Sequence, residues 1–143
     1  MDFKALKTAG TMIGVGTGIG GAIGIVDQMV DVERGIEDGS LQTYKNSVMR
    51  HMRYGAIAGL GLYGFSHTSN KALYTSMLGI GAGIGTISGI QNQIGASKIY
   101  NDAHTDANSL FQSGIRIGAA GMLNGAGAYG GYEVARRIAK GAF

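Results

Sequence analysis

The chain has 143 residues, of which 27 are Gly, none is Pro, Cys or Trp, and only 15% are charged, for a formal net charge of +3. This length suits one domain, and the low charge excludes an intrinsically disordered chain. The glycines lie among Ile, Leu and Met without a three-residue period, which excludes a flexible linker and a collagen helix.

Four stretches without formal charge follow one another along the chain: residues 8–26, 54–70, 72–97 and 117–132. A helix needs about 20 residues to cross a bilayer, so the first and third stretches are long enough and the others are borderline. The polar connection 27–53 begins acidic and ends basic, and its second half is predicted to run into the second stretch as one helix. Two lysines before the first stretch resemble the start of a signal peptide, but a near copy of this stretch in mid-chain favours a structural role.

The chain contains an internal repeat. MIGVGTGIGGAIGIVDQM at 12–29 recurs as MLGIGAGIGTISGIQNQI at 77–94. A second set of residues recurs at nearly the same offset: Arg50, Gly55, Gly59, Gly61, Tyr63 and Gly64 reappear as Arg116, Gly121, Gly125, Gly127, Tyr129 and Gly130. The sequence therefore predicts a tandem duplication, with a first repeat over 1–70 and a second over 71–143, each holding two glycine-rich helices.

The spacing of the glycines favours helices over strands. Alternation with Val, Thr and Ile in the first stretch suits a strand, but the same glycines form four-residue ridges and no Asn-Gly or Asp-Gly turn joins the stretches. Each interior helical Gly costs about 0.8–1.0 kcal/mol relative to Ala, a cost that close backbone packing, as in membrane helices, would offset. We predict an all-α, membrane-associated fold of duplicated helical hairpins packed through glycine zippers. The predicted helix-packing residues are Gly16, Gly20, Gly24, Gly55, Gly59, Gly81, Gly85, Gly89, Gly121 and Gly125.

No pattern in the sequence predicts catalysis. Residues 16–21 match G-x-G-x-x-G, but no strand precedes them, and Thr86 replaces the third glycine in the repeat. The alternating polar residues of 102–108 resemble the start of a calcium loop, yet lack its Gly and final Glu, and a solvated turn or helix start is expected instead. The histidines lack metal-ligand spacing, and no nucleophile elbow is present. We expect no enzyme, no cofactor and no metal.

Basic and aromatic residues flank the uncharged stretches. The basic residues would contact lipid headgroups or nucleic acid, or simply solubilise the helix ends. They are Lys4, Lys7, Arg50, Arg53, Arg116, Arg136, Arg137 and Lys140. Tyrosines near the ends of the stretches suggest an interfacial belt: Tyr54, Tyr63, Tyr74, Tyr100, Tyr129 and Tyr132. The number of membrane crossings and the orientation stay open, because four simple crossings place the basic segment 45–53 opposite both termini.

The segments GTMIGVGTGIGGAIGI, GAIAGLGLYGF, MLGIGAGIGTISGI and GMLNGAGAYGGY resemble the small glycine-rich membrane or DNA-ejection proteins of bacteriophage virions. The motif is generic, since glycine zippers also occur in holins, bacteriocins and other pore formers. The resemblance implies a virion component located in the virion membrane or the host cell membrane. Its implied partners are the lipid bilayer, further copies of the chain, other virion proteins and, through the basic ends, nucleic acid.

Three functions follow from these patterns. The first is an oligomeric, membrane-associated structural protein of a phage virion that supports the internal membrane or a genome-delivery conduit. The second is a pore-forming lytic or toxic protein of the holin or bacteriocin kind. The third is a soluble helical scaffolding module whose glycine-rich helices pack only against protein.

Overall fold

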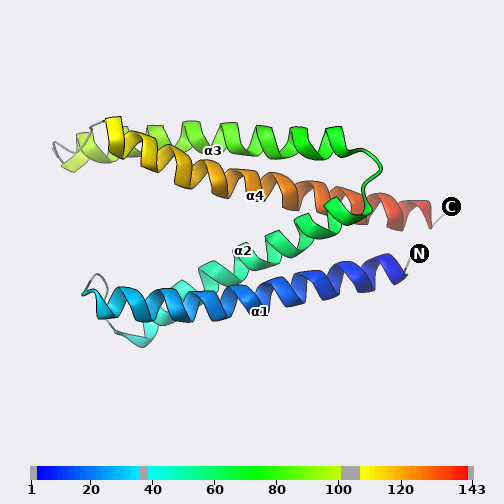
Figure 1. The fold of residues 1–143 in the computed structure, drawn as a ribbon, viewed down its shortest axis with the longest axis horizontal. Helices are drawn as coiled ribbons and strands as arrows, with labels where there is room; N and C mark the ends of the chain where they lie inside the picture. Colours follow the sequence, from blue (N-terminus) through cyan, green and yellow to red (C-terminus); the bar gives the residue numbers. More distant parts are fainter. Residues whose placement is uncertain (1–2, 36–38, 101–106, 142–143) are drawn as a thin grey trace.

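A computed structural model describes residues 3–35, 39–100 and 107–141, and within these ranges it contains four helices and no strand (Figure 1). The helices are α1 (Phe3–Glu33), α2 (Leu41–His67), α3 (Lys71–Tyr100) and α4 (Ala107–Lys140). The predicted all-α class is confirmed. So is the single helix that carries the second half of the polar connection into the second uncharged stretch, because α2 is continuous over 27 residues.

Local capping sets where the helices end. Gly35, just after α1, has a φ of 68°, a conformation that favours glycine, and its amide donates to the Val32 carbonyl at 3.0 Å. Ser40 caps α2, with its hydroxyl accepting from the Thr43 amide at 3.3 Å. Before α3, the Asn70 side-chain oxygen accepts from the Leu73 amide at 2.9 Å. These caps separate long helices with short connections, so consecutive helices run antiparallel.

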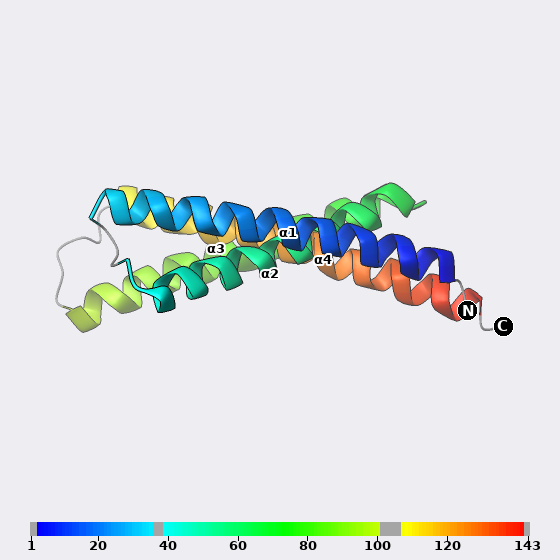
Figure 2. The ribbon, with the colours of Figure 1, turned by 90° about the horizontal axis from the view of Figure 1, so that it is seen from below.

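The four helices form two pairs joined by a crossing. α1 packs along α2, α3 packs along α4, and α2 crosses α4 (Figures 1 and 2). Both termini and the α2–α3 connection lie at one end of the molecule, here called the termini end (Figure 1). Towards the opposite end, here called the open end, the two pairs diverge (Figure 1). Within the described residues α1 and α3 do not contact each other, so the molecule is a wedge rather than a closed bundle.

Apart from Tyr63, Tyr129 and Glu133, the interior is built mainly from small residues, and many large apolar side chains face outwards. Ala5, Ala9 and Tyr63 form the buried cluster at the termini end, with Met12 and Val134 packed against it. Large side chains along α1 and α3 are exposed instead: Val15, Ile19, Ile23, Ile80, Ile84 and Ile87. This distribution is the reverse of the usual one in soluble domains, where large aliphatic residues fill the core.

Candidate helix-packing and membrane-contact surfaces

The contact between α1 and α2 is made by glycines that lie against the main chain of the other helix. A Cβ placed on any of them would come closer than 3.0 Å to a backbone atom of the partner helix. They are Gly16, Gly20 and Gly24 on α1 and Gly55 and Gly59 on α2. At the middle of the contact, Gly20 faces the carbonyl group of His51. Any larger residue at these positions would therefore force the two helices apart.

The contact between α3 and α4 uses the corresponding positions. Gly81, Gly85 and Gly89 on α3 and Gly121 and Gly125 on α4 lie equally close to the partner backbone. The structure thus brings the ten predicted helix-packing glycines together in two rows, one in each helix pair. Gly10, Gly14 and Gly18 on α1 and Gly79 and Gly83 on α3 have open space within 4 Å of an added Cβ.

One polar contact occurs at matching places in both pairs. The Ser47 hydroxyl of α2 donates to the Gly24 carbonyl of α1 at 3.1 Å. The Ser113 hydroxyl of α4 donates to the Gly89 carbonyl of α3 at 3.0 Å. Sequence reasoning overlooked these serines, although each lies three residues before Arg50 or Arg116, the arginines already matched between the two halves. Serine is a frequent residue at close contacts between membrane helices.

The crossing of α2 and α4 is a further close contact, which sequence reasoning did not assign. A Cβ on Gly64 would lie 2.8 Å from the Cα of Gly130, and a Cβ on Gly127 would lie 2.6 Å from the Ile57 side chain. The recurrence of these glycines in the two halves was visible in the sequence. Which helices they join was not, because a repeat shows equivalence and says nothing about contact.

A buried polar cluster lies beside the crossing at the termini end. Glu133 is only 2% exposed, and its carboxylate accepts from the Tyr129 hydroxyl at 3.0 Å and from Arg136 Nη2 at 2.8 Å. Tyr129 also contacts the Thr68 hydroxyl, and Arg137 donates to the His67 carbonyl at 3.1 Å, which ties α4 to the end of α2.

The charge state of Glu133 follows from its surroundings. Burial opposes ionisation, but the hydrogen bonds from Arg136 and Tyr129 and the charges of Arg136 and Arg137 outweigh it, so the pKa of Glu133 is lowered. The carboxylate is therefore ionised at neutral pH and holds two arginines at the end of α4.

The predicted tyrosine belt is wrong for two of its members. Tyr63 and Tyr129 are 0% and 1% exposed because they lie inside the crossing, where Tyr129 also meets the ring of Tyr74 edge-on at 5.4 Å. Tyr54 and Tyr132 are exposed, as a belt requires. The side chain of Tyr100, and residues 102–106 of the rejected calcium pattern, lie outside the described part of the chain.

The predicted basic residues fall into two groups. Lys4, Lys7, Arg136, Arg137 and Lys140 lie on the parts of α1 and α4 at the termini end, whereas Arg50, Arg53 and Arg116 lie on the halves of α2 and α4 nearer the open end. Arg50 Nη2 is 3.6 Å from the carboxylate of Asp27, the first acidic residue after the uncharged part of α1. Among the described residues no group of three or more His, Cys, Asp or Glu is placed to hold a metal ion.

Two helices are long and apolar enough to cross a membrane, α1 (Phe3–Glu33) and the part of α3 from Lys71 to Gly95. Only 17% and 11% of their most apolar windows are buried, so neither is the buried core helix of this fold. Comparison of the chain with protein-family models, curated proteins and solved structures finds no match.

Proposed function

We propose that this chain is a membrane-embedded structural protein of a phage virion, built from two duplicated glycine-zipper hairpins, which supports the internal membrane or a genome-delivery conduit. The observation that carries the membrane part of the proposal is the placement of side chains by size. Glycines line the contacts between helices, while large aliphatic residues such as Ile84, which is 62% exposed, cover the outside of α1 and α3. In water this surface would be unfavourable; in a bilayer it is the expected one.

Four threonine hydroxyl groups of α1 and α3 also suit a lipid environment. Thr8, Thr11, Thr17 and Thr75 each donate to the carbonyl four residues earlier in their own helix, at 2.7–3.0 Å. A polar side chain satisfied within its own helix needs neither water nor a partner protein. This matters in the hydrocarbon core, where an unsatisfied polar group costs several kcal/mol.

Matching contacts in the two halves support the duplication. Gly20 faces the carbonyl of residue 51 and Gly85 faces that of residue 117, and the Ser47 and Ser113 hydrogen bonds complete the parallel. The offsets of 65 residues between α1 and α3 and of 66 between α2 and α4 match those of the sequence repeat. Two hairpins of this kind, joined through α2 and α4, make one unit of the proposed assembly.

Fractionation tests the membrane part of the proposal. The expressed chain should sediment with membranes, resist extraction by alkaline carbonate and require detergent for purification. Recovery as a monodisperse monomer without detergent would refute the proposal and favour the soluble scaffold. Rapid loss of membrane potential on expression would favour the lytic pore former instead.

The virion role rests on the resemblance of the glycine-rich segments to virion membrane proteins. Its test is mass spectrometry of purified phage particles, before and after extraction of their lipid. The proposal expects the chain in the intact particles and in the lipid-associated fraction. If phage particles assembled in cells that express the chain do not contain it, the virion role is wrong, while the membrane role is unaffected.

A further inference from the structure

The face of α2 that contacts α4 changes from apolar to polar along the helix. Near the termini end it is small and apolar, with Ile57 and Gly64 in contact with α4. Residues at alternating spacings of three and four stay on one face of a helix. Continued towards the open end, the same face carries Arg53, Arg50 and Asn46, all of them exposed.

The matching face of α4 changes in the same way. Gly127 and Gly130 contact α2 at the crossing. Leu123 lies on the same face, four residues before Gly127. Arg116, seven residues before Leu123, and Gln112, one turn earlier still, continue this face, and both are exposed. The two helices diverge over these polar segments (Figure 1). Exposed arginines from both hairpins therefore lie on the segments that diverge.

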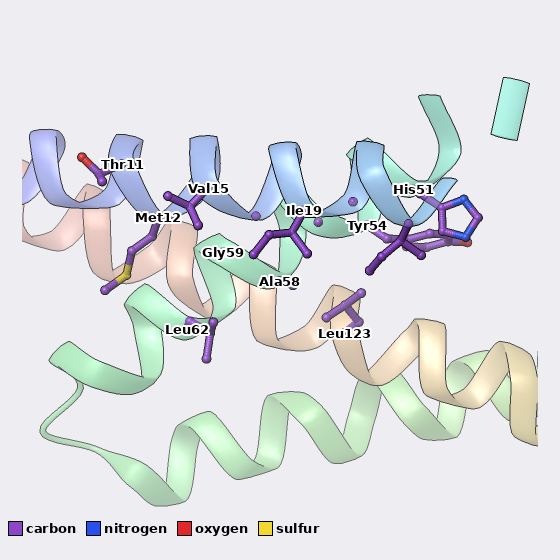
Figure 3. A pocket seen from close by; sticks show the side chains of 14 residues that line it. Thr11, Met12, Val15, Ile19, His51, Tyr54, Ala58, Gly59, Leu62 and Leu123 are labelled. Atoms are coloured by element: carbon purple, nitrogen blue, oxygen red, sulfur yellow. The ribbon is translucent and has the colours of Figure 1, made fainter. Parts of the chain in front are cut away.

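Two grooves adjoin along α2. An apolar groove of about 490 Å³ runs along the contact of α1 with α2 and is also lined by Leu123 of α4 (Figure 3). In this view Ile19 and Leu123 extend into the space from opposite sides. A second groove, of about 500 Å³, follows α2 and is lined by Lys45, Arg50 and Arg53. Tyr54 lines both grooves, so the apolar surface and the cationic surface meet at one side chain.

We propose that these two adjoining grooves bind an anionic phospholipid, with an acyl chain in the apolar groove and the headgroup phosphate at Arg50 and Arg53. The inference rests on the proposed membrane location. The arginines lie at the level expected for a lipid headgroup, because Arg50 Nη2 is 3.6 Å from Asp27, which follows the uncharged part of α1. The residues that line the cationic groove all belong to α2, and a cluster of basic residues beside the apolar part of a membrane helix attracts anionic headgroups.

Charge and shape favour this occupant over two others. A nucleic acid would match the arginines but has no apolar chain for the neighbouring groove. A second copy of the chain, docked through the same face about a two-fold axis, would bring its own Arg50 and Arg53 towards this surface, which like-charge repulsion disfavours. An anionic phospholipid satisfies both surfaces at once.

The test is the thermal stability of the detergent-purified chain with phosphatidylglycerol or phosphatidylcholine added. A ligand that binds only the folded state raises the unfolding temperature. Phosphatidylglycerol should raise it by several degrees more than phosphatidylcholine does. The double variant Arg50→Gln/Arg53→Gln should lose that difference, while Arg34→Gln/Lys71→Gln, which removes the same charge from residues that line neither groove, should keep it. Equal effects of the two lipids, or equal loss in both double variants, would overturn the proposal.

A third variant tests the apolar half of the site. Ala58 lines the apolar groove and is not among the predicted packing positions. Ala58→Phe should reduce the effect of phosphatidylglycerol without removing a charge. If inorganic phosphate or a short oligonucleotide stabilises the wild-type chain as well as the lipid does, the site recognises phosphate alone and the proposal is wrong. Carbonate extraction is scored separately, so a chain that resists extraction but shows no lipid preference refutes this inference only.

Discussion

Individual glycines differ according to the side of the helix on which they lie. Gly20 faces the His51 carbonyl of α2, whereas Gly18, two positions earlier, has open space around an added Cβ. Gly85 and Gly83 differ in the same way on α3. A side chain at the first kind of position must separate two helices, while one at the second kind meets only the surroundings. The same substitution should therefore have opposite effects at neighbouring positions.

Leucine substitution tests this directly. Gly20→Leu and Gly85→Leu should each destabilise the protein by about 1–3 kcal/mol or more, because overpacking forces the helices apart. Gly18→Leu and Gly83→Leu should be neutral or stabilising, since Leu is the better helix former by up to about 1 kcal/mol. Thermal unfolding in detergent measures all four variants. If Gly20→Leu unfolds no earlier than Gly18→Leu, the glycines do not form the helix contacts.

The two serine hydrogen bonds give a second prediction at this scale. Ser47→Ala and Ser113→Ala each remove one bond between helices, and each should cost about 0.5–1.5 kcal/mol. The two losses should add, because the serines lie in different helix pairs and share no partner. Thr75→Val is the matched control, since the Thr75 hydroxyl bonds only within its own helix. A control effect as large as the serine effects would count against a role for these bonds in joining the helices.

At the scale of helices, the crossing of α2 and α4 decides the architecture. It joins two hairpins that otherwise touch little, and Glu133 is a buried, ionised group beside it. The groups around this carboxylate are Tyr129, Arg136 and Arg137 from α4, with Thr68 and His67 at the end of α2 reached through Tyr129 and Arg137. Weakening this cluster should loosen the hairpins from each other before it affects either hairpin.

Acid should weaken the crossing in a predictable direction. The pKa of Glu133 in the folded protein is lowered from its ordinary value of 4.5. Its contribution to stability is therefore fully present above that value and is lost as the pH falls through the lowered pKa. Glu133→Gln should cost about 1–3 kcal/mol at pH 7 and should remove this part of the acid dependence. The unfolding temperature, measured between pH 7 and pH 3, checks this prediction, and Glu33→Gln, at an exposed position, is the control. If Glu133→Gln shows the same pH dependence of unfolding as the wild-type chain, the assignment is wrong.

The sequence was sufficient to predict the helices but not how the pairs meet. Glycines spaced four residues apart around Gly20 and Gly85 form a continuous ridge only on a helix, and this spacing predicted the all-α class. The polar segment that runs directly into the second uncharged stretch predicted the continuous α2. Tyr63 and Tyr129 recur at equivalent positions and resemble interfacial residues, and only the crossing shows that they are buried. Glu133 occupies the place of His67 in the first half, so the repeat gave no sign of the polar cluster.

The whole molecule is open on one side and apolar on the outside. The uncharged parts of α1 and α3 lie on opposite flanks, joined only through α2 and α4 (Figure 1). In the proposed membrane setting, lipid or further copies of the chain would cover these flanks. A soluble protein of this shape would leave large side chains such as Ile84 in water. The environment of α3 therefore separates the proposed membrane protein from the soluble scaffold.

The most direct measurement is the collision accessibility of a nitroxide at Ile84, attached through Ile84→Cys in a chain that has no cysteine of its own. In the membrane-reconstituted protein, the label should collide readily with oxygen, which concentrates in the bilayer core, and rarely with a water-soluble nickel complex. A label attached through Gly39→Cys, in the polar connection, should show the reverse preference. Ready access of the nickel complex at position 84, or shielding of this label from both reagents, would contradict the claim that the large apolar side chains of α3 face lipid.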